Sequence, residues 1–101
     1  MSMVANVVSY TVKPENADEL IRRVQEHLVP AVQRAPGYQG FLLLDQGDGK
    51  RLALVLFESI EAARAAQRTV APIGQEQTYA LMSEQPTTSL GTALIRDGLF
   101  A

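Results

Sequence analysis

Residues 41–57 read FLLLDQGDGKRLALVLF. Two apolar runs, 41–44 and 52–57, flank a polar segment whose glycines can adopt positive φ, and this pattern predicts a β-hairpin. Successive side chains of a strand point to opposite faces of its sheet. Both runs are apolar at every position, so the hairpin is predicted to belong to a sheet that is apolar on both faces.

The residues before this hairpin predict a strand followed by a helix. Residues 4–12 are rich in β-branched side chains and stop before Pro14, which cannot continue a ladder. Residues 15–35 carry apolar side chains at steps of three and four, the spacing of an amphipathic helix. Pro30 should bend the last turns of this helix, and the Pro-Gly pair at 36–37 should end it.

The residues after the hairpin predict a second helix and a last strand. Ser59 is a favourable N-cap, and the helix that it begins should run to about Ala71, before a proline. Residues 73–85 fit either a short third helix or a lid-like loop. The alternating run 87–95 predicts strand four, and 96–101 form a tail or an arm that reaches a neighbour.

These elements follow the order β-α-β-β-α-β, which predicts an α+β, ferredoxin-like domain. In that arrangement two helices pack on one face of a four-stranded antiparallel sheet. The chain has 101 residues, of which 47% are hydrophobic, and this suits a single domain over residues 1–101 with one core.

Composition excludes several classes of partner and chemistry. Nine basic and eleven acidic residues give a net charge of -2 without a cluster of Lys or Arg, so no nucleic-acid partner is expected. A secretory leader pattern and an apolar run of about 20 residues are both missing, so we expect a cytoplasmic protein without a membrane partner. The absence of cysteine excludes disulfides, thiolate nucleophiles and Cys-ligated metal centres.

The two apolar faces of the sheet predict a homodimer. Two helices can cover only one face, and about six to eight large side chains left bare on the other would forgo on the order of 10 kcal/mol. The same face of a second copy, related by a two-fold axis, would cover them. In the alternative, the tail and residues 73–85 fold over that face within one chain.

Several local patterns in order carry a family resemblance over roughly residues 3–95. They are Val12-Lys13-Pro14 before Ala17-Asp18-Glu19-Leu20, then residues 36–41 (PGYQGF), then residues 57–63 (FESIEAA). With them the sequence resembles the antibiotic biosynthesis monooxygenase (ABM) family of the dimeric α+β barrel group. The resemblance implies a homodimer whose facing sheets form a barrel, with a pocket between sheet and helices in each subunit.

The resemblance also bears on cofactors. Asn6 matches the pocket asparagine of the haem-degrading members, but these also share a tryptophan on the second helix and a haem-binding histidine after it. This chain has no tryptophan, and His27 is its only histidine. Phe57 stands where relatives often have tryptophan. Haem degradation is therefore disfavoured, and no cofactor is expected.

Four residues are predicted to bind a ligand: Asn6, Tyr10, Phe57 and Tyr79. Asn6 interrupts an apolar strand and is the best candidate for a catalytic role, although its amide could instead bond to a neighbouring backbone group. Tyr10 falls on the same strand face, and either tyrosine hydroxyl could bind a substrate oxygen or be an ordinary core or rim group.

No metal site is predicted. A lone histidine is a poor metal ligand set, and we expect His27 to have a surface or packing role. The spacing of Asp45 and Asp48 fails the calcium-loop pattern.

The resemblance implies a small-molecule pocket protein that acts as a cofactor-independent monooxygenase on quinol or phenolic, polyketide-type substrates. The substrate anion would supply the electrons, and the protein a dry pocket with a few hydrogen bonds. The alternative is a non-catalytic dimeric module that binds a ligand or serves as a scaffold. The sequence leaves open which of the two holds, and the identity of the substrate.

Overall fold

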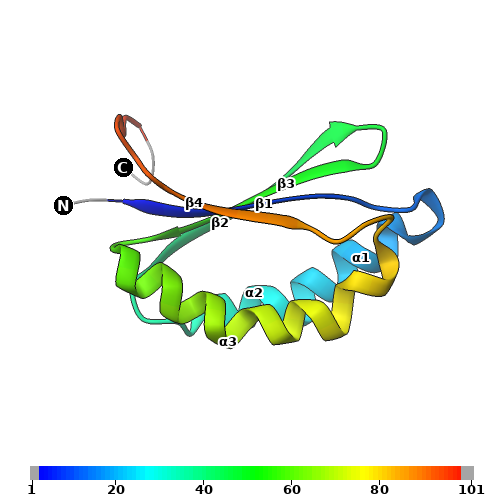
Figure 1. The fold of residues 1–101 in the computed structure, drawn as a ribbon, viewed down its shortest axis with the longest axis horizontal. Coiled ribbons are helices and arrows are strands. Elements are labelled where there is room, and N and C mark those ends of the chain that lie inside the picture. The colour runs from blue at the N-terminus through cyan, green and yellow to red at the C-terminus, as the bar shows by residue number, and fades with distance from the viewer. Residues whose placement is uncertain (1–2, 99–101) are drawn as a thin grey trace.

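A four-stranded antiparallel sheet forms one layer of the protein, and the helices lie across one of its faces (Figure 1). The computed structural model describes residues 3–98. The strands are β1 (Val4–Thr11), β2 (Tyr38–Gly47), β3 (Lys50–Phe57) and β4 (Thr87–Thr92). Their spatial order is β2-β3-β1-β4, so the predicted α+β, ferredoxin-like fold is confirmed.

The hairpin of β2 and β3 is longer than its apolar runs. Asp45 pairs with Arg51 and Gly47 with Lys50, so the ladder continues through the polar residues, and only Asp48 and Gly49 form the turn. Both turn residues have positive φ, 55° and 81°. The backbone ladder depends on main-chain groups, so polar side chains at the exposed end do not stop it.

The first helical region changes pitch along its length. A 3₁₀ turn, η1 (Pro14–Asn16), leads into α1 (Ala17–Arg23), then a π-helical turn, η2 (Val24–Leu28), and α2 (Val29–Gln33). In the π turn the N–H of Val29 donates to the carbonyl of Val24, five residues back. Pro30 has no N–H for the carbonyl four residues back, so the wider turn lies where the regular ladder would be interrupted.

The predicted end of the second helix at Ala71 was wrong. Helix α3 spans Ile60–Thr78 and passes through Pro72. Pro72 has no N–H to donate to the carbonyl four residues earlier. Because Pro72 is exposed, water can bind to that carbonyl instead. The N-terminus of α3 is as predicted, because the Oγ of Ser59 accepts a hydrogen bond from the N–H of Ala62 at 3.1 Å.

Residues 73–85 form neither a separate helix nor a lid. They comprise the last turns of α3, the 3₁₀ turn η3 (Tyr79–Leu81) and a connection to β4. A β-bridge between Val12 and Met82 fixes this connection beside the end of β1. The segment therefore lies on the helix side of the sheet and does not cover the other face.

Strand β4 ends at Thr92, and the prediction of a strand up to residue 95 was wrong. Its neighbour β1 begins at Val4, which pairs with Thr92, and one further bond joins the N–H of Ala93 to the carbonyl of Met3 at 2.8 Å. Beyond this bond, none of the residues between 3 and 98 pairs with the chain that follows β4. The predicted tail from 96 onward is described up to Gly98, and residues 99–101 lie outside the described residues.

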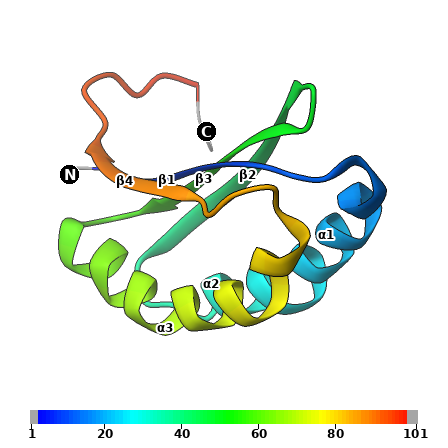
Figure 2. The same cartoon turned by 45° about the vertical axis from the view of Figure 1, so that its right-hand side comes forward.

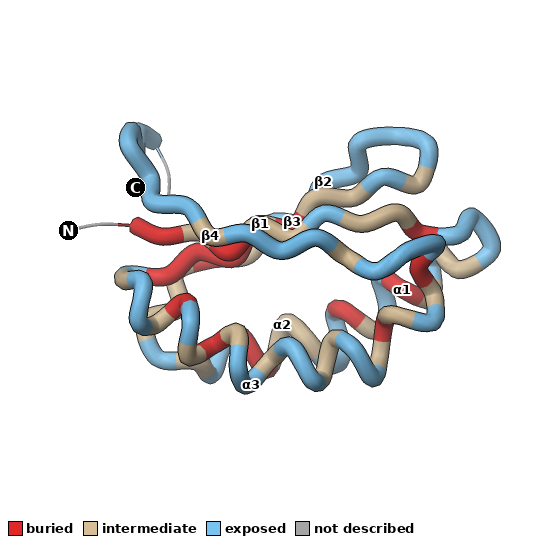
Figure 3. The backbone as a smooth tube through the Cα atoms, in the orientation of Figure 1, coloured by how far each residue is buried: buried red, intermediate tan, exposed pale blue. Residues whose placement is uncertain are grey.

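The core lies between the sheet and the helices, where Figure 3 shows the buried positions. Phe57 is fully buried and packs edge-on against Tyr38 with ring centroids 6.3 Å apart. Alanines 63 and 66 of α3 lie against the same cluster. A second cluster joins Val12 to the first helix at the other end of the sheet.

No helix covers the opposite face of the sheet (Figures 1 and 2). Leu42 and Leu44 of β2 lie on this face with 44% and 41% of their surface exposed. Leu52 and Leu54 of β3 are half-buried beside them. The sheet is therefore apolar on both faces, as predicted. None of the helices between residues 3 and 98 has the length and hydropathy needed to cross a membrane.

Candidate ligand-binding cavity

A cavity of about 400 Å³ lies between the sheet and the helices. Cavities of roughly 300–1,000 Å³ are the usual size for small-molecule sites. Apolar side chains from both layers form most of its wall, and they include Val8, Phe41, Leu43, Ala53, Val55, Leu20, Val24, Leu28 and Val70. The site is therefore suited to an apolar molecule.

Small residues on α3 leave the space open. Ala66, Ala71 and Gly74 line the cavity where larger side chains would fill it. Gly74 faces Leu28 of the first helical region, and a Cβ at Gly74 would lie 3.6 Å from Cδ2 of Leu28, an ordinary contact distance. Leu28 belongs to the π turn, a distortion that is frequent at functional sites. The two helical regions therefore contact each other at this wall of the cavity.

Asn6 is a buried polar group among these apolar walls. It is 5% exposed and lies between Val55 of β3 and Leu90 of β4 in the sheet register. Its Nδ2 donates to the carbonyl of Ala63 at 3.1 Å. Its Oδ1 is buried and has no hydrogen-bond partner among residues 3–98. Because a carbonyl can only accept, this bond fixes the amide orientation and leaves an unpaired acceptor.

Tyr10 lies on the same face of β1, about 13 Å further along the strand. Burial raises the pKa of its phenol, and the charge of Arg51, its partner on β3, partly opposes this rise. The phenol is therefore protonated near neutrality and can donate a hydrogen bond. Arg51 pairs with Asp45 at 3.0 Å and borders a second hollow of about 340 Å³, which shares Phe41 with the cavity wall.

Phe57 and Tyr79 border the cavity from its two ends. Phe57 lies at the end of β3, opposite Val4, and Tyr79 lies in η3 directly after α3. All four residues predicted from the sequence therefore line one cavity, although they come from three elements. Whether they bind a ligand stays a prediction.

Sequence reasoning missed several polar residues of the wall. Gln67 and Arg68 of α3 and Thr88 of β4 also line the cavity. Thr78 is 2% exposed and donates through its hydroxyl to the carbonyl of Gly74. Placing the helix end at Ala71 removed Thr78 from the predicted helix, and no motif marks the other three.

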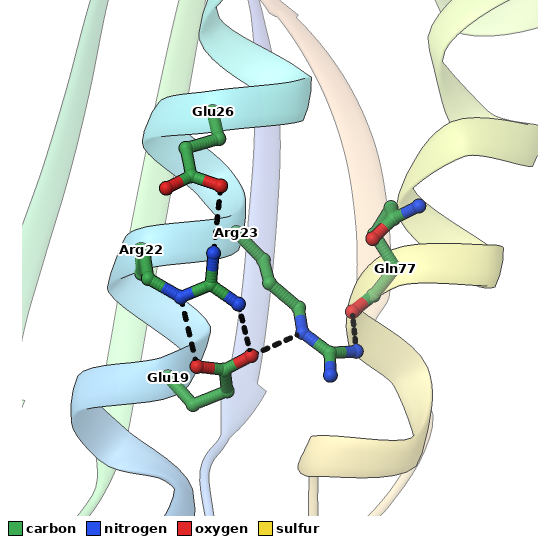
Figure 4. A network of polar contacts seen from close by, with 5 residues as sticks. All are labelled: Glu19, Arg22, Arg23, Glu26 and Gln77. Carbon is green, nitrogen blue, oxygen red and sulfur yellow. Dashed lines mark hydrogen bonds and ion pairs between the residues drawn. The ribbon is translucent and has the colours of Figure 1, made fainter.

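A network of polar contacts joins α1 to the last turn of α3 (Figure 4). Arg23 of α1 donates to the carbonyl of Gln77 in the last turn of α3 at 2.9 Å. Glu19 accepts from Arg23 at 2.8 Å and also from Arg22. Hydrogen bonds from Arg22 first, and then Arg23, lower the pKa of Glu19 to about 2. The network ties the two helices together next to Tyr79.

The remaining candidates for chemistry lie elsewhere. His27 is exposed on the first helical region and is not among the lining residues. Asp45 accepts the N–H of Gly47 at 2.9 Å in addition to its pair with Arg51. No group of three metal-binding side chains occurs in the part of the chain that the structure describes.

Solved structures share this fold at low sequence identity. One is NE2512, a protein of unknown function from Nitrosomonas europaea, with 18% identity, a TM-score of 0.81 and coverage of 95% of this chain and 93% of that one. Another is Rv0793 from Mycobacterium tuberculosis, with 15% identity, a TM-score of 0.77 and coverage of 95% and 99%. A variant of SnoaB, a cofactor-independent oxygenase from Streptomyces nogalater, has 21% identity, a TM-score of 0.74 and coverage of 97% and 99%.

The sequence itself points to one family. No curated protein matches it at a significant level. The family model of antibiotic biosynthesis monooxygenases matches residues 3–71, which is more than half of the chain and includes β1, the first helical region, the hairpin and the first half of α3. The chain therefore belongs to the antibiotic biosynthesis monooxygenase family.

Proposed function

We propose that the chain is a cofactor-independent monooxygenase that acts on quinol or phenolic, polyketide-type substrates as a homodimer. Family membership and the likeness to an oxygenase that needs no cofactor support this reading. The observation that carries it is the unpaired, buried Oδ1 of Asn6 in the wall of an apolar cavity.

The free acceptor on Asn6 favours a ligand with an O–H group. A buried acceptor without a partner costs about 1–3 kcal/mol, and a ligand donor would recover this. A ketone or quinone oxygen could not, because both it and Oδ1 only accept hydrogen bonds. Tyr10 is a donor and could hold a second oxygen at the far end. A flat, apolar molecule with a hydroxyl at one end and a further oxygen at the other matches this arrangement.

Such a substrate can react with oxygen without a cofactor. In a phenol with an activated methylene group, loss of a proton gives an anion that is oxidised directly. One atom of O₂ enters the substrate and the other leaves as water, so that R₂CH₂ and O₂ give R₂C=O and H₂O. The cavity would exclude bulk water and fix the anion through Asn6 and Tyr10. The lining residues include no carboxylate or histidine, so the acidity of the substrate itself must supply the anion.

The lack of a general base in the wall also favours the second candidate, a dimeric module that binds a ligand without turning it over. Both candidates require the cavity and the free acceptor of Asn6. They differ in whether oxygen is consumed.

Oxygen uptake with a panel of quinols and anthrone-like phenols separates the two. We expect turnover by the wild type and a loss of about 10- to 100-fold in kcat/KM for Asn6→Ala, because one buried hydrogen bond is removed. Asn16→Ala is the matched control, since Asn16 also donates to a backbone carbonyl, that of Leu81, but does not line the cavity. Tight binding without oxygen uptake across the panel would favour the binding module.

The homodimer is proposed on the uncovered face of the sheet. Leu42 and Leu44 are each more than two-fifths exposed on a face that no helix covers. A second copy placed with the same face inward would remove these side chains from water. Sedimentation equilibrium should give twice the chain mass of 11.0 kDa. A monomer at micromolar concentration would contradict this part of the proposal.

A further inference from the structure

The exposed residues of the cavity wall lie on one side of the site. Among the side chains that line the cavity, those of Arg68 and Ala71 on α3 and of Thr88 on β4 are exposed, and the others are buried or half-buried. We call these three residues the rim. Strand β4 is an edge strand of the sheet, and α3 lies below it in both views of the ribbon (Figures 1 and 2).

The opposite side of the cavity has no exposed lining residue. The lining residues of the first helical region are all buried or half-buried, and they are Leu20, Val24, Leu28 and Val32. The same holds for the lining residues of β2 and β3. The rim therefore marks the side from which solvent and a ligand reach the cavity, between α3 and β4.

Arg68 brings a positive charge to this opening. None of the other lining residues between 3 and 98 has a charged side chain. Arg68 makes no ion pair within the same residues, where the ion pairs involve only the arginines at 22, 23 and 51. A guanidinium without a carboxylate partner, at the mouth of an apolar cavity, attracts an anion. The rim therefore favours a negatively charged ligand over a neutral one of the same shape.

The groups of the rim suit a carboxylate. The guanidinium of Arg68 is planar and can donate two parallel hydrogen bonds to the two oxygens of a carboxylate. The hydroxyl of Thr88, on the β4 side of the opening, can donate another. A phosphate monoester carries close to two negative charges, whereas the rim supplies a single cation. A singly charged carboxylate is therefore the better match.

Arg68 and the contact of Asn6 lie along the same helix. The carbonyl of Ala63, which accepts from Asn6, is five residues before Arg68 on α3, a rise of about 8 Å along the helix axis. A flat aromatic molecule can therefore place a hydroxyl at Asn6 while its carboxylate lies at Arg68. An anion at the exposed rim keeps part of its hydration, which avoids the large cost of burying a charge.

We propose that Arg68 makes the cavity selective for aromatic ligands that carry a carboxylate, which it binds at the rim while Asn6 binds the hydroxyl inside. This inference rests on the proposed function and adds a specificity residue to it. A charge pair that is open to solvent contributes modestly and is weakened by salt. The preference should therefore be strongest at low ionic strength.

Two matched probes test this role through binding, without turnover. One is a fluorescent naphthol that carries a carboxylate on its second ring, and the other is the same naphthol without the carboxylate. In fluorescence titrations at low ionic strength, Arg68→Gln should raise the dissociation constant of the acid by about 3- to 10-fold and that of the naphthol by less than about twofold. In the wild type, about 1 M salt should weaken the binding of the acid alone.

Arg64→Gln is the matched control. Arg64 is exposed about one turn earlier on α3 and carries the same charge, but it does not line the cavity. Its replacement should leave both dissociation constants unchanged. An equal weakening of the acid by the two variants would mean that overall charge attracts it, and would overturn the role of Arg68.

The naphthol without a carboxylate separates this inference from the proposed function. If it binds and Arg68→Gln leaves the affinity for the acid unchanged, the role of Arg68 is overturned and the ligand cavity stands. If neither probe binds to the wild type, the proposed function and the inference fall together.

Discussion

The side-chain amide of Asn6 on β1 donates to the main-chain carbonyl of Ala63 on α3 at 3.1 Å, which joins two residues 57 positions apart. The bond holds the sheet to the helix and at the same time turns the Oδ1 of Asn6 into an acceptor without a partner among the described residues. One residue thus combines a structural contact with the free polar group on which the proposed function depends.

Asn6→Leu should separate the two roles of this residue. Leucine is similar in size and removes the unpaired acceptor together with the donor, so the free energy of unfolding should fall by less than about 1 kcal/mol or rise. Ligand binding and oxygen uptake should be lost. Urea unfolding followed by the uptake assay checks both, and a loss of several kcal/mol would mean that the bond to Ala63 is mainly structural.

Tyr10→Phe should lower kcat/KM by about 3- to 10-fold, because it removes one hydrogen-bond donor from the cavity. Burial raises the pKa of this phenol, so the wild-type group keeps its proton from pH 6 to 9 and the loss should be constant over that range. Over that range the rate should follow the ionisation of the substrate. Tyr38→Phe is the control, since Tyr38 packs on Phe57 and is not a lining residue. A pH-dependent effect of Tyr10→Phe would contradict this role.

The pairing of Glu19 should make the protein sensitive to acid. Its pKa is about 2 in the folded protein against 4.5 for the free group, so the unfolded chain binds more protons. The stabilisation is therefore complete above about pH 4.5 and is lost as the pH falls toward 2. Glu19→Gln should reduce the change of the unfolding free energy with pH between about 4.5 and 2. Glu15→Gln, at an exposed carboxylate without an ion pair in residues 3–98, should leave the slope unchanged.

Two glycines should respond to alanine in opposite directions. Gly74→Ala should stabilise the protein by about 0.5–1 kcal/mol, because the position is helical and a Cβ would make an ordinary contact with Leu28. Gly37→Ala should destabilise it by more than that, since φ is +81° and the new Cβ would lie 2.8 Å from the Cβ of Ala62. Thermal unfolding of both variants checks the sign, and a stabilised Gly37→Ala would be unexpected.

The sequence predicted the elements that depend on local pattern. The continuous apolar runs of the hairpin, the helical spacing of residues 15–35 and the Ser59 cap are each read over a few residues, and the structure has all three. The strand face shared by Asn6 and Tyr10 also follows from a period of two, which is why both candidates line the same cavity.

Two element ends were predicted wrongly for a common reason. Helix α3 continues past Pro72 because the affected side of the helix faces water, and β4 stops at Thr92 because β1 has begun at Val4. Both depend on which groups lie nearby in space. A proline or an alternating pattern alone does not contain that information.

By itself, the sequence determined the order of the elements and a sheet that is apolar on both faces, since side-chain alternation and helical spacing are local properties of the chain. Only the tertiary structure decided that Asn6 bonds to Ala63 and that Tyr79 meets the same cavity. The physical reason is that hydrogen bonds and cavities between layers depend on the distance between residues far apart in the chain, which folding sets.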